Sequence, residues 1–443
     1  MKFYDRENEI AYLRSECDLS RQSARLTVVT GRRRVGKTQL IQKAMEDVGP
    51  TLYLLVSRRA EVDQCADFLE RARDALALSI YGNNIRFRDL FKALMEESTR
   101  RPFTLVIDEL QEFWKIDPGI FSDIQEVWDA YHGKSKINII TCGSVNTLMN
   151  QIFFDDGQPL YGRCTSKLKL EPFTLPVLHS ILADHNPKCT ADDLLALWTF
   201  TGGVARYVEE LMDRGFTTRK RMVDGILGEH SYFFDEGRSV LVQEFGREYG
   251  TYFSILAAIA RGATTRNEIE QIVGTSVGGY LTRLETDYGL IARKQPIFES
   301  TTNKASRYKI VDNFFAFWFR FVFKNADLIE LKRYDVLRDI LRRDYEVFSG
   351  LALEGYFREK FIEEKRYTRI GGWWDRKGEN EIDLVCEDST TGRLDFFEVK
   401  RDKSRINLTG LRAKVDAFLR KNPELRDRKI DCHGLSLSTG DML

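Results

Sequence analysis

The 443-residue sequence predicts an α/β fold in which a parallel sheet with covering helices is followed by helical segments and a smaller α/β domain. Two patterns predict it. Over the first 175 residues, short apolar runs alternate with helical stretches, which is typical of a parallel sheet buried on both faces. From residue 176 the pattern is mainly helical, with a hairpin pattern at 288–310 and further strands after about residue 348. Because this length exceeds one ordinary core, we expect several structural units.

The first part contains a complete phosphate-loop motif. Its strand candidates are 26–30, 51–56, 103–108, 136–142 and 166–170. Residues 31–38 read Gly-Arg-Arg-Arg-Val-Gly-Lys-Thr and directly follow the first of them. Gly31 and Gly36 let backbone N–H groups point at a phosphate, Lys37 reaches the β- and γ-phosphates, and Thr38 ligates Mg²⁺. A helical pattern that begins with Gln39 places a positive helix end beneath the anion. The sequence therefore predicts a P-loop NTPase that binds ATP and Mg²⁺.

An acidic pair, Asp108-Glu109, ends the third strand candidate. Asp108 is placed to hold the water shell of the metal, and Glu109 to polarise an attacking water. Both this pair and the phosphate loop fall at the carboxyl edge of the predicted sheet, where nucleotides bind in such folds. A glycine-rich turn without function is the alternative. The acidic pair favours nucleotide hydrolysis over it.

Composition limits the other functions. With 67 basic and 67 acidic residues the formal charge is zero, so any contact with nucleic acid must come from local patches. The seven cysteines include no C-x-x-C pair, which suits reduced thiols in a cytoplasm. Residues 1–16 are charged and lack a signal-peptide core, and the apolar run 314–323 is short and contains Arg320. We therefore expect a cytoplasmic protein without a membrane span.

The middle of the chain divides into three predicted parts: a helical lid at 176–243, a winged helix-turn-helix at 244–312 and a helical linker at 313–345. Helices at 252–260, 265–273 and 276–285 precede the hairpin, which is the order of a winged helix. The candidate contacts with DNA phosphates are Arg266, Arg283, Arg293 and Lys294. Such a unit also serves as a packing element beside an ATPase, and solvated surface charge explains the same residues.

The last predicted domain, 346–443, begins with a helix at 348–361. Phe348, Leu351, Phe357 and Phe361 are expected to form an apolar stripe that includes Glu354. A carboxylate there is costly unless it is paired or binds a cation. Glu354 is therefore either a member of a structural ion pair or part of a site.

Two strands follow, and they carry an acid and an acid-x-Lys pattern. Glu398 and Lys400 share one face of the second strand, and Asp383 lies on the first. Asp383 and Glu398 suit Mg²⁺ through oxygen ligands, while Lys400 orients or deprotonates a water that attacks a phosphodiester. This predicts an α/β nuclease-like domain. Structural ion pairing is the alternative use of the same charges.

The motifs resemble those of the archaeal-type ATPases, relatives of the AAA+ and STAND groups. The resemblance is carried by the motifs at 3–7, 31–38, 105–109, 142–144, 161–163 and 202–203. It extends to 276–281, 307–319 and 372–375, which look like that family's winged helix and its C-terminal domain, itself similar to PD-(D/E)XK nucleases. The resemblance thus covers essentially the whole chain.

The resemblance implies roles for four more residues. Arg6 and Glu7 are expected near the adenine, Ser144 facing the γ-phosphate, and Arg163 as an arginine finger. A surface charge is the alternative for Arg163. The sequence departs from the family at three positions. Asp5 stands where glycine is common, and Ala205 stands where the family's Gly-Gly-x-Pro motif has proline. Ile382 precedes Asp383 in place of the proline of the PD motif.

Three functions remain open at this stage. The first is an ATP-regulated nuclease that acts on DNA, with a homo-oligomer forming when ATP binds. The second is a nucleotide-dependent switch whose nuclease-like domain only binds DNA or a protein. The third is a DNA-binding regulator that uses the winged helix.

Overall fold

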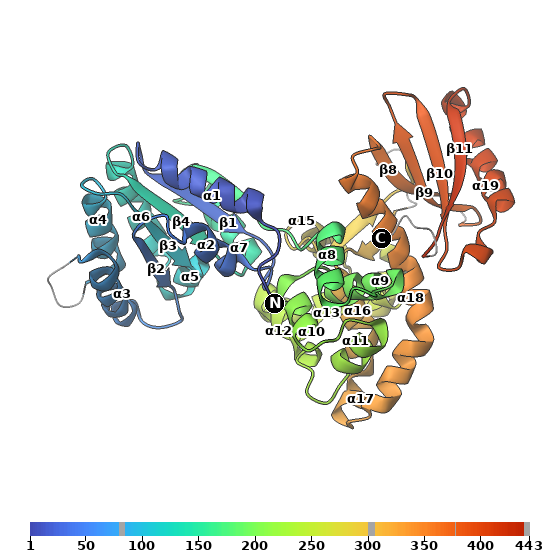
Figure 1. Cartoon of the computed structure of the whole chain (residues 1–443), viewed down its shortest axis with the longest axis horizontal. Coiled ribbons are helices and arrows are strands. Elements are labelled where there is room, and N and C mark those ends of the chain that lie inside the picture. Colours follow the sequence, from blue (N-terminus) through green and yellow to red (C-terminus); the bar gives the residue numbers. More distant parts are fainter. Residues whose placement is uncertain (79–84, 300–305, 377, 438–443) are drawn as a thin grey trace. The chain divides into compact units, whose positions relative to one another are not determined.

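The computed structural model of the chain describes residues 1–78, 85–299, 306–376 and 378–437. It consists of two compact units, an N-terminal unit, Lys2–Pro172, and a C-terminal unit, Phe173–Leu443 with Met1. Both are drawn in Figure 1. The division between them lies beside residue 175, where the sequence predicts the end of the ATPase core. The finer predicted boundaries stay predictions.

The N-terminal unit is built on a five-stranded parallel sheet with the strand order β2-β3-β4-β1-β5. The strands are β1 (Arg25–Thr30), β2 (Thr51–Leu55), β3 (Phe103–Asp108), β4 (Ile137–Cys142) and β5 (Ser166–Lys169). All the predicted strands are present. β3 and β4 are buried along their whole length, because each is apolar on both faces.

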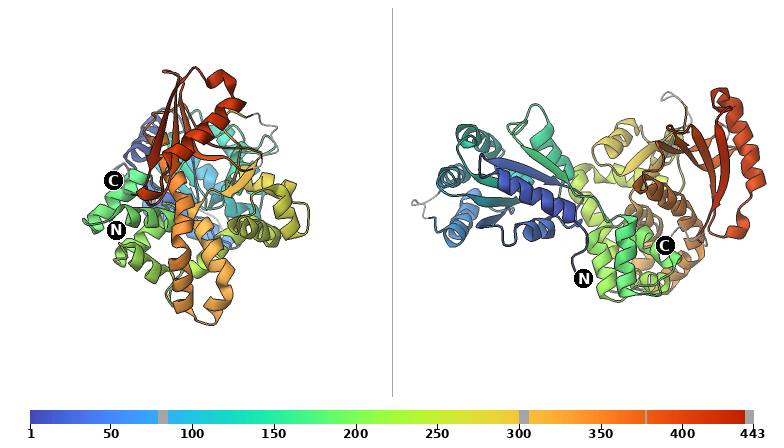
Figure 2. Two further views of the ribbon diagram at one scale, coloured as in Figure 1. Left: turned by 90° about the vertical axis from the view of Figure 1, so that its right-hand side faces the viewer. Right: turned by 45° about the horizontal axis from the view of Figure 1, so that its top comes forward.

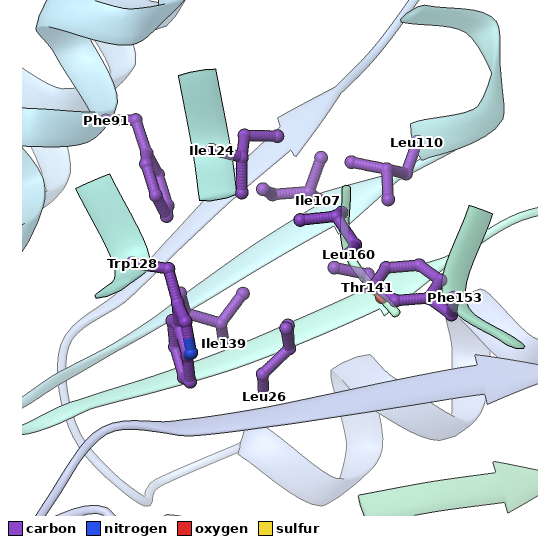
Figure 3. A pocket seen from close by; sticks show the side chains of 10 residues that line it. All are labelled: Leu26, Phe91, Ile107, Leu110, Ile124, Trp128, Ile139, Thr141, Phe153 and Leu160. Carbon is purple, nitrogen blue, oxygen red and sulfur yellow. The ribbon is translucent and has the colours of Figure 1, made fainter. Parts of the chain in front are cut away.

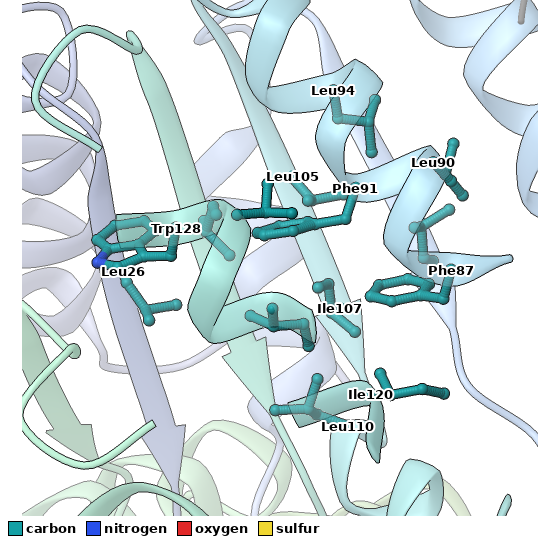
Figure 4. Packing of buried hydrophobic residues seen from close by; sticks show 14 of the residues in the cluster. Leu26, Phe87, Leu90, Phe91, Leu94, Leu105, Ile107, Leu110, Ile120 and Trp128 are labelled. Carbon is teal, nitrogen blue, oxygen red and sulfur yellow. The ribbon is translucent and has the colours of Figure 1, made fainter. Parts of the chain in front are cut away.

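Helices cover both faces of this sheet. α1 (Glu7–Leu19) and α2 (Lys37–Met45) pack on one face. The other face carries α3 (Glu61–Leu76), α4 (Phe87–Glu97), α6 (Gly119–Tyr131) and α7 (Asn146–Phe154), with η1 (Leu110–Glu112) and α5 (Phe113–Ile116) between α4 and α6. Figure 4 shows the second core, where Phe91 of α4 and Trp128 of α6 lie near Leu105 of β3. The predicted α/β fold is confirmed.

The C-terminal unit begins with helices, as predicted for a lid. They are α8 (Leu175–His185), α9 (Ala191–Thr201), α10 (Ala205–Asp213), α11 (Arg219–Ile226) and α12 (Phe233–Phe245). Thr190 begins α9 with a capping box to Asp193. The φ angle of Gly202, 59°, ends α9 in the left-handed conformation that glycine tolerates.

Next come three helices and a hairpin, in the predicted order. After η2 (Gly246–Glu248), they are α13 (Tyr249–Ala260), α14 (Arg266–Val273), α15 (Gly278–Thr286), β6 (Ile291–Lys294) and β7 (Arg307–Ile310). Thr265 and Glu268 form the capping box of α14. β6 and β7 pair antiparallel.

The aromatic segment 314–323 is buried, as predicted. It comprises α16 (Asn313–Phe317), a π-helix (Trp318–Val322) and the start of η4 (Phe323–Asn325). The Phe317 ring lies 4.9 Å from that of Phe200 in α9, so this segment shares a core with the helices of the predicted lid. Within the described ranges, no helix is both long and apolar enough to cross a bilayer.

After α17 (Ala326–Glu330), α18 (Tyr334–Glu363) is one continuous helix of 30 residues, so the predicted boundary between 345 and 346 falls inside it. Phe348, Phe357 and Phe361 of the predicted apolar stripe are buried. Leu351 is 53% exposed, so its place in that stripe is wrong. The helix turns the Leu351 position toward solvent, while neighbouring positions pack on α9 and on the last sheet.

A four-stranded sheet completes the chain, with the order β11-β10-β9-β8. Its strands are β8 (Arg369–Trp374), β9 (Glu381–Asp388), β10 (Arg393–Val399) and β11 (Lys429–Leu435), with η5 (Lys403–Arg405), α19 (Leu408–Lys421) and η6 (Pro423–Leu425) between β10 and β11. Phe396 packs against Phe418 of α19, while Phe397 packs against Phe361 of α18. Successive residues of a strand point to opposite faces, so the two helices cover opposite faces of the sheet (Figure 2).

Candidate functional site

The phosphate loop joins β1 to α2 in the N-terminal unit. Gly31 and Gly36 have φ angles of 139° and 101°, which residues with a Cβ rarely adopt. A Cβ on Gly31 would also lie 2.4 Å from the carbonyl oxygen of Leu170. The buried Nζ of Lys37 donates to the carbonyl oxygens of Gly31 and Arg32, at 2.8 and 3.0 Å. The loop thus holds an ammonium group beside a helix N-terminus, an arrangement suited to phosphate.

Asp108, at the end of β3, accepts four hydrogen bonds. Its Oδ2 accepts from the Thr38 hydroxyl at 2.9 Å and from the Tyr53 hydroxyl. Its Oδ1 accepts from the Cys142 thiol and from the N–H of Glu109, both at 2.9 Å. The Thr38 hydroxyl and the Asp108 carboxylate are hard oxygen groups side by side, and they fit Mg²⁺.

Two of these partners, Tyr53 and Cys142, were not expected from the sequence. Burial and the nearby Asp108 carboxylate raise the pKa of the Tyr53 hydroxyl and that of the Cys142 thiol. Both groups therefore remain protonated donors near neutral pH. They fix the orientation of the Asp108 carboxylate, because each donates a hydrogen bond to it.

Glu109 is directed toward the end of the neighbouring strand β4. Its Oε2 accepts from the Ser144 hydroxyl at 2.8 Å, from the Ser144 N–H at 3.4 Å and from the Gln111 side-chain amide. A Cβ on Gly143 would lie 2.1 Å from Oε1 of Gln111, so a larger residue there would displace the Gln111 side chain. The structure thus brings the predicted Glu109 and Ser144 together.

The residues expected near the adenine have different surroundings. Arg6 is buried, and its Nη2 donates to the carbonyl oxygen of Glu171 at 2.7 Å while Nη1 pairs with Glu9 at 3.0 Å. Glu7 begins α1, Gln39 lies in the first turn of α2, and both side chains are exposed. Arg6 therefore ties the start of α1 to the segment after β5, next to the phosphate loop.

Arg163, the expected arginine finger, makes a bidentate ion pair with Asp129. Its Nε and Nη2 lie 2.9 and 2.7 Å from the two carboxylate oxygens. Its Nη1 donates to the carbonyl oxygens of Pro159 and Tyr161. The hydrogen bond with Asp129 raises the pKa of Arg163 and lowers that of Asp129. Any contact of Arg163 with a nucleotide requires this pair to open.

A second cluster lies in the C-terminal unit, where β9 and β10 pair antiparallel. The Asp383 Oδ2 accepts from the N–H of Val399 at 2.7 Å and from Lys400 Nζ at 3.3 Å. The same Nζ lies 3.9 Å from Oε1 of Glu398, whose Oε2 accepts from the N–H of Asn407 at 2.5 Å. The structure thus brings the predicted Asp383 and Glu398 together around the predicted Lys400.

Glu354 of α18 lies within electrostatic reach of this cluster. Burial raises the pKa of Glu354 to about 7, with a further contribution from Asp383, against the effects of Lys309 and Lys294. In the part of the chain that the structure describes, no three carboxylate, histidine or cysteine side chains are grouped as a metal site. The assignment of Asp383, Glu398 and Glu354 as metal ligands stays a prediction.

The predicted DNA contacts of the helix-turn-helix differ in their surroundings. Arg266 pairs with Glu270 at 2.8 Å, and Arg283 lies 3.4 Å from Glu248. Arg293 is exposed. Lys294 is half-buried and interacts with the charges of Glu354 and of two neighbouring cations.

A small apolar cavity lies inside the N-terminal unit, between the sheet and α4, α6 and α7 (Figure 3). Ten side chains line it, and none of them is charged. Thr141 contributes a buried hydroxyl, and the remaining lining side chains are aliphatic or aromatic. Because phosphates and metal ions need charged or polar partners, this cavity is a packing gap and not part of the site.

Comparison with known proteins places this chain in a family. A family described as an ATPase domain predominantly from Archaea matches residues 3–211, and one described as archaeal and bacterial proteins of unknown function matches residues 318–410. An uncharacterized protein of Methanocaldococcus jannaschii is 30% identical over 408 residues, which are 90% of this chain and 87% of that protein.

Two solved structures share the fold. The Walker-type ATPase of Pyrococcus abyssi has a TM-score of 0.51 and 18% identity, over 72% of this chain and 96% of that one. The ORC2 protein of Aeropyrum pernix, in complexes with ADPNP and ADP, has a TM-score of 0.51 and 16% identity, over 75% of this chain and 96% of that one. The family match and the long relative lead to one conclusion: the chain belongs to the archaeal-type ATPases, whose ATPase domain is found predominantly in Archaea.

Proposed function

We propose that this chain is a cytoplasmic ATPase that binds ATP with Mg²⁺, hydrolyses it at Glu109, and uses the nucleotide state to regulate cleavage of DNA by its C-terminal domain. One observation supports the ATPase part most directly. The Thr38 hydroxyl and the Asp108 carboxylate meet at 2.9 Å, beside Lys37 and Glu109, at the carboxyl edge of the parallel sheet. The nucleotide complexes of the similar ORC2 protein support it further.

Each residue of the phosphate site has a distinct task. Lys37 exchanges its bonds with the carbonyl oxygens of Gly31 and Arg32 for bonds with the β- and γ-phosphates. Thr38 and Asp108 would hold Mg²⁺, which would supply positive charge against the phosphate oxygens. Glu109 orients and polarises the attacking water, and the Ser144 hydroxyl, which donates to its carboxylate, holds that carboxylate in position.

Arg163 is proposed to act on a neighbouring subunit. An arginine finger stabilises the charge that develops on the transferred phosphoryl group. In the chain described here Asp129 holds this side chain. Assembly with ATP bound would therefore replace the Asp129 carboxylate with the γ-phosphate of the neighbour, which makes a homo-oligomer part of the proposal.

The cluster of Asp383, Glu398 and Lys400 supports phosphodiester cleavage. Two carboxylates on paired strands share one lysine, at 3.3 and 3.9 Å. Oxygen ligands of this kind suit Mg²⁺, and a nearby lysine can position or deprotonate a water. Glu354 interacts electrostatically with Asp383, and we propose that it supports the ligand shell of the metal.

One observation favours a second candidate function, a nucleotide-dependent switch. In that case the nuclease-like domain binds DNA or a protein without cleaving it. Lys400 already pairs with both carboxylates, and each carboxylate also accepts a backbone N–H. An ion-pair network of this kind stabilises a fold without catalysis.

The deciding experiment measures cleavage of plasmid and single-stranded DNA with Mg²⁺ or Mn²⁺, with and without ATP. Wild type should cleave, and Asp383→Asn should not, because an amide of the same size loses the charge that holds the metal. Lys400→Ala should reduce the rate by about 10²- to 10⁴-fold, as expected for a positioned proton-transfer group. Asp388→Asn, at the other end of β9, is the matched control and should cleave normally. Absence of cleavage by wild type would favour the switch.

A further inference from the structure

The β6–β7 hairpin carries three cations on one face. In its antiparallel pairing, Lys294 lies opposite Arg307, and Ala292 lies opposite Lys309. Opposite residues of such a pair point to the same side, and residues two apart on a strand share a face. Lys294, Arg307 and Lys309 therefore form one cationic inner face. Arg293 points to the other side and is exposed.

The inner face lies against the elements that carry the acidic cluster. Lys309 Nζ donates to the carbonyl oxygen of Leu351 in α18 at 3.3 Å. Arg307 pairs with Glu381 of β9 at 3.0 Å, and its guanidinium lies 4.7 Å from the centre of the Trp374 ring. α18 and β9 are also the elements of Glu354 and Asp383.

The segment after β6 fixes the hairpin in this position. The N–H of Ile297 donates to the carbonyl oxygen of Gly372 in β8 at 2.9 Å. Its side chain is buried in the core cluster of the last sheet, with Trp373. Arg369 of β8 stacks on the Phe298 ring at 4.8 Å. The cations are thus held in place before any ligand binds, which lowers the entropic cost of binding.

The charges on this face favour an anion. Burial lowers the pKa of Lys294 to about 8, and the neighbouring cations Lys309 and Arg358 lower it further, against the opposing effects of Glu354 and Glu359. Burial and the neighbouring cations both disfavour the charged form of Lys294, and an anion beside it would favour that form. A phosphate group between them would relieve the repulsion, as phosphate contacts by lysine do in DNA-binding proteins.

We propose that Lys294 and Lys309, on the inner face of the hairpin, bind phosphates of the DNA strand that reaches Asp383, Glu398 and Lys400. The proposal rests on the proposed nuclease function and adds the part of the site that holds the substrate. In this proposal the hairpin does not contact DNA as the exposed wing of a winged helix does. Its outer face, which carries Arg293, makes no contact with the DNA backbone.

The test measures DNA binding by the full chain in EDTA, so that no metal-dependent cleavage occurs. Fluorescently labelled single-stranded and duplex DNA are titrated at several salt concentrations. Lys294→Gln and Lys309→Gln should each weaken binding and reduce the slope of log Kd against log salt by about 1. Lys294→Arg and Lys309→Arg keep the charge and should keep the slope. Arg293→Gln, on the outer face of the same strand, is the matched control and should bind like wild type.

The outcomes separate this proposal from the cleavage itself. Normal binding by both lysine variants, or an equal loss in Arg293→Gln, would overturn the assignment of the inner face whether or not wild type cleaves DNA. Weaker binding by the lysine variants would support it even if wild type proves unable to cleave. Failure of wild type to bind either form of DNA, or a clear preference for RNA of the same sequence, would also overturn it. Unchanged melting temperatures and ATP hydrolysis show that the variants are folded.

Discussion

Ser144 donates its hydroxyl to the Glu109 carboxylate, with 2.8 Å between Oγ and Oε2. The two residues follow the neighbouring strands β4 and β3, which pair in parallel. The contact therefore links the residue expected to face the γ-phosphate with the residue proposed to polarise the water.

Removing this link should slow ATP hydrolysis more than it weakens ATP binding. A hydrogen bond to a charged group contributes about 1.5–3 kcal/mol, so Ser144→Ala should lower turnover by about 10- to 100-fold. Steady-state phosphate release and ATP affinity, measured on the same protein, check this. Ser144→Thr keeps the hydroxyl and should retain most of the turnover. A Ser144→Ala protein with wild-type turnover would show that the contact has no part in hydrolysis.

Thr38 should contribute to ATP affinity only when Mg²⁺ is present. Thr38→Val has a similar shape and lacks the hydroxyl that bonds to Asp108. We expect its affinity for ATP to fall by about 10-fold in Mg²⁺ and to match wild type in EDTA. Thr38→Ser is the control with a hydroxyl. Equal losses in Mg²⁺ and in EDTA would argue against a role in metal binding.

Arg163 should complete the active site of a neighbouring subunit. Arg163→Ala should lower ATP turnover by at least about 10³-fold, the usual contribution of an arginine finger. Mixing Arg163→Ala with Lys37→Ala should restore part of the activity, because each protein supplies what the other lacks. A protein that stays monomeric with ATP bound, as judged by light scattering, would contradict this.

Asp129 provides the matching control for Arg163. Its ion pair with Arg163 is partly exposed, so Asp129→Asn should change stability by no more than about 0.2–1 kcal/mol. The same change frees the Arg163 side chain and should leave turnover intact. Loss of turnover in both variants, with a large fall in melting temperature, would indicate a structural pair instead.

Glu354 should make the stability of the C-terminal unit depend on pH. Its pKa rises to about 7 in the folded chain, above the usual value for a glutamic acid. The protonated form is therefore favoured by folding, and this stabilisation is lost as the pH rises from about 4.5 to about 7. In EDTA, the melting temperature of Glu354→Gln relative to wild type should be higher at about pH 8 than at about pH 5. A difference that does not vary with pH would contradict this sign.

Much of the nucleotide site could be predicted because its signals are local in sequence. The phosphate loop follows an apolar strand directly, and the Asp108-Glu109 pair ends another, so motif and strand together placed both at one edge of the sheet. Tyr53 and Cys142 carry no such signal. They reach Asp108 only because β2 and β4 pair on either side of β3.

The C-terminal unit shows the same limit. Strand periodicity placed Glu398 and Lys400 on one face, and the structure brings both near Asp383. Periodicity puts Arg293 and Lys294 on opposite faces of the strand, but it could not tell which face is the inner one, because packing of the hairpin against α18 decides that. Leu351 was misplaced for a similar reason, since the partners of a long helix change along its length.

The proposed hydrolysis of ATP at Glu109 is tested most directly by phosphate release from Glu109→Gln, with ATP binding measured on the same preparation. We expect this variant to bind ATP like wild type and to lose turnover, because the amide keeps the size of the side chain and loses the charge that polarises water. Glu126→Gln, on α6 of the same unit, should hydrolyse ATP normally. Wild-type turnover by Glu109→Gln would contradict the account.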